Sequence, residues 1–501
     1  MDAFLDDSRL KPLLVRDQKI RRLGEIKAAL EWDQETGLPA DAVDGRAEQL
    51  ALLEGLIHEE KVSPAWAGLF KTVESGPPLS VAGKALVREL QRDLKTAWKL
   101  PAEFVEREAR LVSKSQSVWA AARRQKDFAA FLPSFASLVA MAREKADLLG
   151  WSEHPYDALL DLYEPGATTK DVKRVLGELE TGVVGLVRAI AQKPVVSNEV
   201  LTRSYPRAQQ EAAARRIAAD LGLDAKASRL DVTTHPFCTT LGPRDVRITT
   251  RYDEGFFATA LYGVIHETGH ALYEQGVDPR LGATVLGGGT SLGMHESQSR
   301  FWENRVGRSK AFIEHYWPVF KAAFPESLSD SNAASFYRAV NRVEPSFIRV
   351  EADEVTYSLH ILLRFRLETA LLDGSLLPAD VPEAWNQEFQ RLFGKTPPDN
   401  AQGCLQDVHW AMGGIGYFPT YALGNLYAAQ LTQTMVRDLD LDQKIAQGDF
   451  APVLAWLRQK IHQHGRIYSA AELCVQVTGR ALEAAPFLSY LTSKYGELYG
   501  L

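Results

Sequence analysis

A five-residue motif inside one apolar helical stretch constrains this chain more than any other feature. Positions 266–270 carry His-Glu-Thr-Gly-His, within a run of helical periodicity over 256–273. Residues four apart share one face of a helix, so His266 and His270 converge. Burying both imidazoles without a ligand would be costly. The pattern is typical of zinc peptidases, in which the two histidines bind one metal ion and the glutamate acts on a water molecule.

Composition excludes several other classes of function. The chain has 501 residues, 46% of them hydrophobic, and a net charge of −7. These values are ordinary for a large globular protein and argue against a nucleic-acid partner. No apolar run approaches the roughly 20 residues that a membrane span needs, and the acidic first residues lack the order of a signal peptide. Three scattered cysteines, Cys238, Cys404 and Cys474, predict no disulfide framework and favour the cytoplasm.

Helical periodicity dominates the chain, so we predict a mainly α fold. One segment, 230–251, carries β-branched residues on both sides of a Gly-Pro turn and predicts a β-hairpin just before the 256–273 helix. No linker or repeat divides the chain, which predicts one catalytic domain over 1–501, with the helices of about 1–125 as a cover over a cleft. Helices are expected at about 15–33, 46–59, 82–97, 102–123, 127–149, 169–192, 206–221, 253–275, 292–306, 309–324, 345–373, 383–393, 423–447, 450–463, 468–477 and 485–498.

A third metal ligand is needed, because catalytic zinc usually takes three protein ligands and leaves one position for water. After a Gly-Gly-Gly loop at 287–289, Ser291 is placed to cap a new helix. Glu296 lies near the start of that helix, 26 residues after His270. Two antiparallel helices joined by this loop would bring Glu296 to the metal, with His295 as the main alternative ligand.

Several further motifs occur in one order along nearly the whole chain, and together they resemble the carboxypeptidase Taq family of metallocarboxypeptidases. The motifs are Trp32-Asp33-Gln34-Glu35-Thr36, His235-Pro236-Phe237, Asp245-x-Arg247-x-Thr249, His266-Glu267-x-x-His270, His295-Glu296-Ser297-Gln298, Ile348-Arg349-x-x-Ala352-Asp353 and Gly403-x-x-Gln406-Asp407-x-His409-Trp410.

This resemblance implies a large helical fold similar to neurolysin and angiotensin-converting enzyme, with a small hairpin or sheet beside a deep cleft. It implies a homodimer that removes C-terminal amino acids from peptides with broad specificity. It also implies that Glu296, rather than His295, is the third metal ligand.

The roles of the remaining catalytic residues follow from the chemistry and from the resemblance. Glu267 is predicted to be the general base that takes a proton from a metal-activated water and passes it to the leaving amine. His409 and Tyr421 are predicted to stabilise the oxyanion, since related peptidases are similar in using a histidine and a tyrosine about twelve residues apart. The alternatives are a packing histidine beside Trp410 and a core tyrosine in an aromatic stretch.

A carboxypeptidase must also bind the terminal carboxylate of its substrate, and the planar fork of an arginine suits that group. Arg349 is the leading candidate and Arg247 the second. Arg349 has a competing interpretation, because Asp353 lies four residues later on the helix predicted for 345–373.

The predicted hairpin offers a second contact for the substrate. An extended peptide could add to an exposed strand edge near Thr249. His235 would line the same groove, or else be an ordinary turn residue before Pro236.

The sequence therefore predicts one divalent metal ion per chain. Zinc is the expected ion, although the same ligands also serve Co²⁺ and Mn²⁺. The expected substrates are peptides with a free C-terminus. The alternatives are a zinc endopeptidase or oligopeptidase, an aminopeptidase, and a catalytically inactive peptide-binding scaffold.

Overall fold

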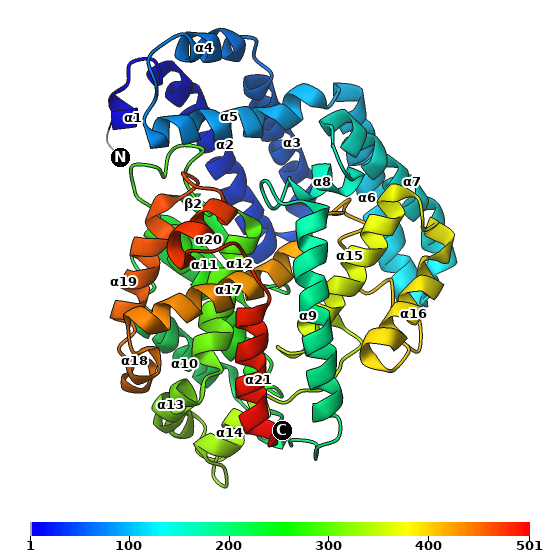
Figure 1. Cartoon of the computed structure of the whole chain (residues 1–501), viewed down its shortest axis with the longest axis vertical. Coiled ribbons are helices and arrows are strands. Elements are labelled where there is room, and N and C mark those ends of the chain that lie inside the picture. The colour runs from blue at the N-terminus through cyan, green and yellow to red at the C-terminus, as the bar shows by residue number, and fades with distance from the viewer. Residues whose placement is uncertain (1–2) are drawn as a thin grey trace.

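The computed structural model describes residues 3–501 and confirms a mainly helical fold with one small sheet (Figure 1). The helices of the first half are α1 Ala3–Asp6, α2 Lys11–Thr36, α3 Val43–Lys61, α4 Ala65–Glu74, α5 Val81–Lys99, α6 Ala102–Gln125, α7 Phe128–Leu149, α8 Pro155–Leu160, α9 Thr169–Ile190 and α10 Arg207–Asp220. Those of the second half are α11 Phe257–Gly276, α12 Leu292–Arg300, α13 Lys310–Ala323, α14 Ala333–Val340, α15 Tyr357–Asp373, α16 Val381–Phe393, α17 Pro419–Asp438, α18 Leu441–Gln447, α19 Ala451–Lys460, α20 Ala470–Thr478 and α21 Ala485–Tyr499.

The sheet has three strands in the order β1-β3-β2, with β1 Ser228–Val232, β2 Cys238–Gly242 and β3 Asp245–Thr250. The predicted hairpin is confirmed as the antiparallel pair β2–β3, and β1 adds to β3 in parallel. The expectation of an exposed strand edge at Thr249 is wrong, because β3 is the central strand. Thr249 pairs with Asp231 of β1, is fully buried, and its hydroxyl accepts the backbone N–H of Phe237 at 2.8 Å.

The helix predicted for 345–373 forms only in its second part. Arg349–Glu351 is a single 3₁₀ turn, and α15 begins at Tyr357. The carboxylate of Asp353 accepts the backbone N–H groups of Val355 and Thr356, at 2.9 and 3.0 Å. This local capping competes with helix continuation, a known tendency of aspartate that periodicity does not detect.

Other boundaries also differ from the predicted ones. The helix predicted for 423–447 is two helices, because the Asp440 side chain caps the start of α18. The helix predicted for 292–306 is α12 followed by a π-helix, η3, over Phe301–Gly307. The short helices α4, α8 and α14 were not predicted, since few turns give little periodic signal.

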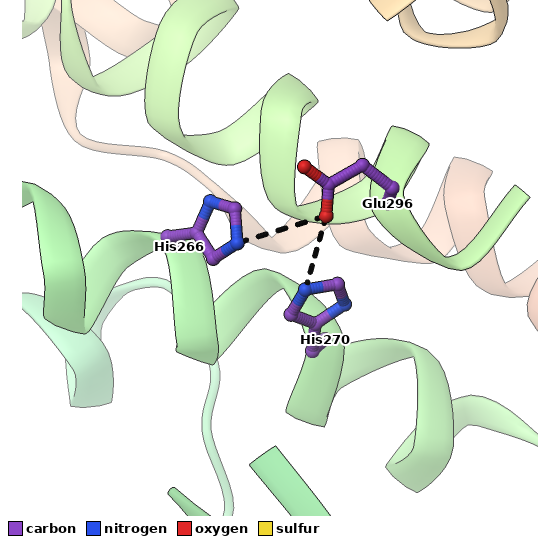
Figure 2. Close-up of side chains that lie close together, drawn as sticks. All are labelled: His266, His270 and Glu296. Carbon is purple, nitrogen blue, oxygen red and sulfur yellow. Dashed lines mark ion pairs between the residues drawn. The ribbon is translucent and has the colours of Figure 1, made fainter. Parts of the chain in front are cut away.

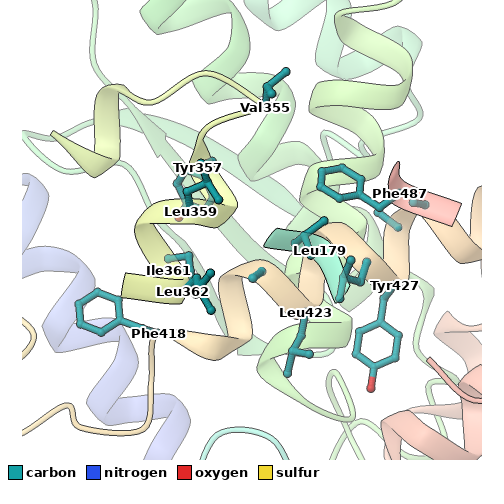
Figure 3. Close-up of a cluster of buried hydrophobic side chains, with 14 of the residues drawn as sticks. Leu179, Val355, Tyr357, Leu359, Ile361, Leu362, Phe418, Leu423, Tyr427 and Phe487 are labelled. Carbon is teal, nitrogen blue, oxygen red and sulfur yellow. The ribbon is translucent and has the colours of Figure 1, made fainter. Parts of the chain in front are cut away.

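Two large hydrophobic clusters contain most of the buried apolar side chains of residues 3–501. The smaller one joins α1–α5 to the segment Val277–Leu286 after α11, and the larger one contains α6 and most of the remaining helices. Figure 1 accordingly shows α1–α5 gathered at one end of the molecule. Part of the larger cluster, drawn in Figure 3, packs α15 against α17 with Phe418 just before α17. The larger cluster also includes apolar residues of α11, α12 and α17, the helices around the site described below.

Three helices, α11, α12 and α17, approach one another closely at two glycines. A Cβ atom on Gly269 of α11 would lie 2.6 Å from Cα of Ser299 in α12. A Cβ atom on Gly424 of α17 would lie 2.5 Å from Cγ of Glu296 in α12. Real Cβ atoms do not approach so closely, so both positions require glycine at this helix spacing.

Replacing Gly269 by alanine is expected to destabilise the protein by about 1–3 kcal/mol, because the new methyl group collides with backbone of α12. The matched control is Gly263→Ala on the same helix, where the Cβ atom would meet only Thr250 Oγ1 at 3.6 Å. That change should leave stability unchanged or raise it by up to about 1 kcal/mol, through the better helix propensity of alanine. Thermal unfolding of both variants checks the prediction, and equal midpoints would contradict it.

Candidate metal centre and active site

Three side chains converge where the helices α11 and α12 pack against each other. His266 and His270 project from one face of α11, and Glu296 faces them from α12 (Figure 2). Glu296 Oε2 lies 3.7 Å from His266 Nε2 and 3.4 Å from His270 Nε2. Ligand atoms about 2.0–2.2 Å from one ion lie about 3.3–3.6 Å apart in a tetrahedral site, so the three residues fit a divalent metal.

The outward-facing nitrogens of the two imidazoles are occupied by other partners. His266 Nδ1 lies 2.9 Å from Oε2 of Glu303, and His270 Nδ1 lies 2.6 Å from Nδ1 of His295. Both Nε2 atoms are left to face Glu296. The second ring nitrogen of a metal-binding histidine is usually engaged in this way, so the pattern is itself an argument for ligation.

Glu303 reaches His266 from the π-helix η3, which continues directly from α12. A π-turn shifts the direction of the following side chains relative to an α-helix and is frequent at functional sites. Arg300 connects the two carboxylates, since its Nε donates to Glu296 Oε1 at 2.7 Å and its Nη1 to Glu303 Oε2 at 3.3 Å. Burial opposes ionisation of Glu296, but Arg300, His266 and His270 together outweigh it and hold the pKa of Glu296 well below its usual range.

The two histidines differ in their electrostatic environment. Burial lowers the pKa of His270 to about 4, so that imidazole is neutral and ready to bind a metal at neutral pH. Burial also opposes the charged form of His266, but Glu296 and Glu303 outweigh it and raise the pKa of His266 to about 8. A metal ion bound at these nitrogens would therefore compete with a proton at His266.

Glu267 lies on α11 between the two histidines and is 7% exposed. Burial raises the pKa of its carboxyl group to about 7. The pKa of the Cys238 thiol on β2 is raised chiefly by burial, and the charge of Glu267 contributes to the rise. A carboxyl group that titrates near neutral pH is suited to exchanging a proton during catalysis.

His409 and Tyr421 meet at the entry to α17, with His409 Nε2 3.3 Å from the Tyr421 hydroxyl. Burial, with help from two nearby arginines, lowers the pKa of His409 to about 4, so its ring is neutral. The pKa of the Tyr421 hydroxyl is raised well above its usual value, chiefly by burial, and the charge of Glu296 contributes. The structure thus brings the predicted pair together and places Tyr421 within electrostatic reach of Glu296.

Arg349 is buried, at 5% exposure, and its ion-pair partner is Asp407 rather than Asp353, the partner in the competing interpretation. Its Nε and Nη2 atoms donate to Oδ1 of Asp407 at 3.0 and 2.9 Å, and its Nη1 donates to the Tyr357 hydroxyl at 3.0 Å. The guanidinium also stacks 5.0 Å from the Tyr421 ring centre. The arginine and the predicted oxyanion pair therefore belong to one cluster.

Arg364 of α15 binds the second oxygen of Asp407, with Nε 2.7 Å from Oδ2, and is fully buried. The cluster of Arg349, Arg364 and Asp407 thus carries two positive charges and one negative charge. A buried site with one excess positive charge favours an anionic partner. Sequence reasoning missed Arg364, for which no motif or spacing gave a signal, whereas Asp407 lay within the 403–410 motif and could have been found there.

The other predicted substrate contacts lie on or beside the sheet. Arg247 forms a two-point ion pair with Asp245 and stacks 5.6 Å from the ring centre of Trp32 in α2. His235 is exposed in the connection between β1 and β2. Thr249 is fully buried in the central strand.

No helix among residues 3–501 combines the length and the apolar character that a membrane span requires.

Comparisons with known proteins agree with this geometry. The model of the carboxypeptidase Taq (M32) metallopeptidase family matches residues 13–495. Thermostable carboxypeptidase 1 of Thermus thermophilus is 43% identical over 97% of this chain and 98% of its own length. Carboxypeptidase 1 of Bacillus subtilis is 40% identical over 96% of this chain and 97% of its own length.

Solved structures give the same result at the level of the fold. The M32 carboxypeptidase of Deinococcus radiodurans superposes with a TM-score of 0.96 at 39% identity, covering 99% of this chain and 100% of its own. Metallocarboxypeptidase 1 of Trypanosoma cruzi superposes with a TM-score of 0.93 at 36% identity, covering 97% and 99%. These matches, with which the converging side chains described above are compatible, establish that the chain belongs to the carboxypeptidase Taq (M32) family and is a divalent-metal-dependent carboxypeptidase.

Proposed function

We propose that this metallocarboxypeptidase uses zinc, held by His266, His270 and Glu296, to remove single residues from the C-terminus of peptides. The observation that carries the proposal is the convergence of two Nε2 atoms and one carboxylate oxygen, with both Nδ1 atoms engaged on the outside. Two imidazoles and one carboxylate form a donor set that zinc favours in catalytic sites. Bound there, zinc would supply Lewis-acid polarisation of the scissile carbonyl and lower the pKa of the attacking water.

In this proposal Glu267 moves the proton. Its carboxylate takes a proton from the attacking water and passes it to the nitrogen of the leaving amino acid. Burial of Glu267 favours the transfer, because a carboxylate out of bulk water is a stronger base than an exposed one.

His409 and Tyr421 would donate hydrogen bonds to the oxygen that becomes negative in the transition state. Their mutual contact at 3.3 Å orients both groups before the substrate binds. The neutral state of His409 leaves it an N–H donor without adding a further charge beside the two arginines.

Arg349 is proposed to recognise the terminal carboxylate of the substrate. The excess positive charge shared by Arg349, Arg364 and Asp407 supports this role, since a carboxylate would neutralise it. Arg247 is the weaker candidate, because Asp245 already neutralises it at two points. Thr249 would act only indirectly, by holding Phe237 of the neighbouring segment, while the exposed His235 remains a candidate for contact with the substrate.

The oligomeric state, the compartment and the domain organisation belong to the same proposal. A homodimer is supported by the family resemblance, and a cytoplasmic location by three cysteines that are all unpaired. We propose one catalytic domain in which α1–α5, held by their own hydrophobic cluster, serve as the cover over the cleft. Neither nucleic acid nor membrane is proposed as a partner.

Removal of the metal is expected to abolish activity reversibly. Dialysis against a chelator should yield inactive but folded protein, and one equivalent of Zn²⁺ per chain should restore cleavage of a peptide with a free C-terminus. Titration with Zn²⁺, Co²⁺ and Mn²⁺, followed by activity and by metal analysis, identifies the ion that binds with the highest affinity. Full activity of a metal-free preparation would contradict the proposal.

A further inference from the structure

His270 is connected to a second carboxylate through an intervening imidazole. His270 Nδ1 lies 2.6 Å from Nδ1 of His295, and His295 Nε2 lies 2.8 Å from Oε1 of Glu274. Glu274 follows His270 by one turn on α11, whereas His295 stands at the start of α12. The three residues therefore form a chain of hydrogen bonds that closes the gap between the two helices on the side away from Glu296.

The donor and the acceptor of each hydrogen bond in this series can be worked out from Glu274, its last member. Glu274 accepts hydrogen bonds from the Gly289 backbone N–H at 3.3 Å and from the Thr240 hydroxyl at 3.2 Å. Its ionised carboxylate can only accept, so Nε2 of His295 must donate to it. A neutral imidazole that donates from Nε2 has its lone pair on Nδ1.

The same reasoning shows which ring nitrogen of His270 carries the proton. With both rings neutral, Nδ1 of His295 accepts, and Nδ1 of His270 therefore carries the proton and donates it. The lone pair of His270 is then on Nε2, which faces Glu296 at 3.4 Å. The opposite arrangement would place a hydrogen atom on the nitrogen that has to bind the metal.

We propose that His295 and Glu274 are positioning residues that hold His270 in the tautomer and ring orientation required for metal binding. The inference rests on the proposed metal site and adds two residues to it. The sequence offered His295 as an alternative metal ligand. In the present proposal it does not bind the metal itself but contacts His270, which does. The two metal-binding histidines then differ, because Glu303 supports His266 directly whereas a second imidazole separates His270 from its carboxylate.

The surroundings of His295 keep its ring in one place. The ring packs 5.3 Å from the ring centre of Tyr273, and a Cβ atom on Gly289 would lie 2.6 Å from its Cδ2. His295 and Glu274 also border a cavity of about 870 Å³ between α5, the 161–168 segment and the start of α12. Water from this cavity could replace a deleted side chain, so the test requires a substitution that fills the same space.

The test compares Zn²⁺ affinity, measured by competition with a chromophoric chelator, in His295→Leu and His295→Asn. Leucine fills the space without accepting a hydrogen bond, and the dissociation constant is expected to rise by about 10- to 100-fold. Asparagine places its Oδ1 near the position of the imidazole Nδ1, so His295→Asn should restore most of the affinity that leucine loses. The matched control is His462→Leu, a buried histidine that also packs on Tyr273 but bonds Gln298 instead of a metal-binding residue.

Several outcomes would overturn the inference. Parent-like affinity in His295→Leu would exclude a role in metal binding, and equal losses in the leucine and asparagine variants would show that packing, not the hydrogen bond, matters. An equal loss of Zn²⁺ affinity in His462→Leu would likewise show that packing, not the hydrogen bond to His270, matters. Should His295→Leu fail to fold, Glu274→Leu tests the other end of the hydrogen-bonded series. Unchanged Zn²⁺ affinity in Glu274→Leu would then overturn the inference. Failure of the parent protein to bind Zn²⁺ would instead contradict the proposed function.

Discussion

Replacing Glu267 by glutamine should reduce turnover by about 10²- to 10⁴-fold while the protein still binds one metal ion per chain. Glutamine has nearly the same shape as glutamate but cannot take the proton of the attacking water. His266, His270 and Glu296 are unchanged, so the metal site should persist. The measurement is kcat on a peptide with a free C-terminus, together with metal content of the same preparation.

A matched control for this change is Glu164→Gln. Glu164 is also a buried carboxyl group whose pKa burial raises to about 7, but its hydrogen bonds go to Ser291 and Gly293 at the start of α12. Its substitution should cost far less activity than that of Glu267. A metal-replete Glu267→Gln enzyme with normal turnover would exclude the general-base role.

Replacing Arg349 by alanine should lower kcat/KM for free-carboxylate peptides by about 30- to 1000-fold. This range corresponds to the 2–4 kcal/mol typical of losing one partner in a buried, hydrogen-bonded charge pair. C-terminally amidated peptides, which lack the charge, should be cleaved with nearly unchanged and already low efficiency. Asp407 keeps Arg364 as its partner, so the variant does not leave an isolated buried charge.

Two further variants sharpen this test. Arg349→Lys keeps the charge but not the planar fork, and should recover only part of the lost kcat/KM. Arg247→Ala removes an arginine that Asp245 already neutralises, and should have a smaller effect on the preference for free carboxylates. Equal losses on free and amidated peptides in Arg349→Ala would remove the carboxylate-binding role and favour an oligopeptidase.

The helix α11, which carries His266 and His270, is predictable because the residues that determine it lie close together in the sequence. The spacing of His266 and His270 places both on one face of any regular helix, and the apolar residues around them predict its burial. Ser291 as the cap of α12 is likewise a local signal, and its hydroxyl accepts the N–H of Met294 in the folded chain. These local signals narrow the third ligand to two neighbours, His295 and Glu296.

The choice between those neighbours is not local. Adjacent residues on a helix point about 100° apart, so His295 and Glu296 meet different sides of the His270 ring, and only Glu296 faces its Nε2 atom. A long-range contact confines Glu296 from its other side, because α17 approaches it closely at Gly424, where a Cβ atom would lie 2.5 Å from Cγ of Glu296. The family resemblance favours Glu296, and the fold places that residue opposite the two histidines, whereas spacing alone leaves both neighbours open.

Arg349 shows the limit of sequence reasoning most clearly. The only partner that the spacing suggested, in the competing interpretation, lay four residues away, whereas the observed partner, Asp407, lies 58 residues away. Long-range pairs depend on how helices pack, and packing depends on many weak contacts that no short pattern records. The same reason explains why β3 proved to be a central strand, and Thr249 a buried residue.

The sequence by itself determined a pair of histidines on one helix face, a glutamate between them, and a mainly helical fold to hold them. Periodicity and capping act over one or two turns, and these features need no more. Only the tertiary structure decided the partners of these groups, namely Glu303 and His295 behind the two histidines and Asp407 between two buried arginines. Those partners set proton positions and charge, because burial makes each hydrogen bond and each ion pair far more consequential than it would be in water.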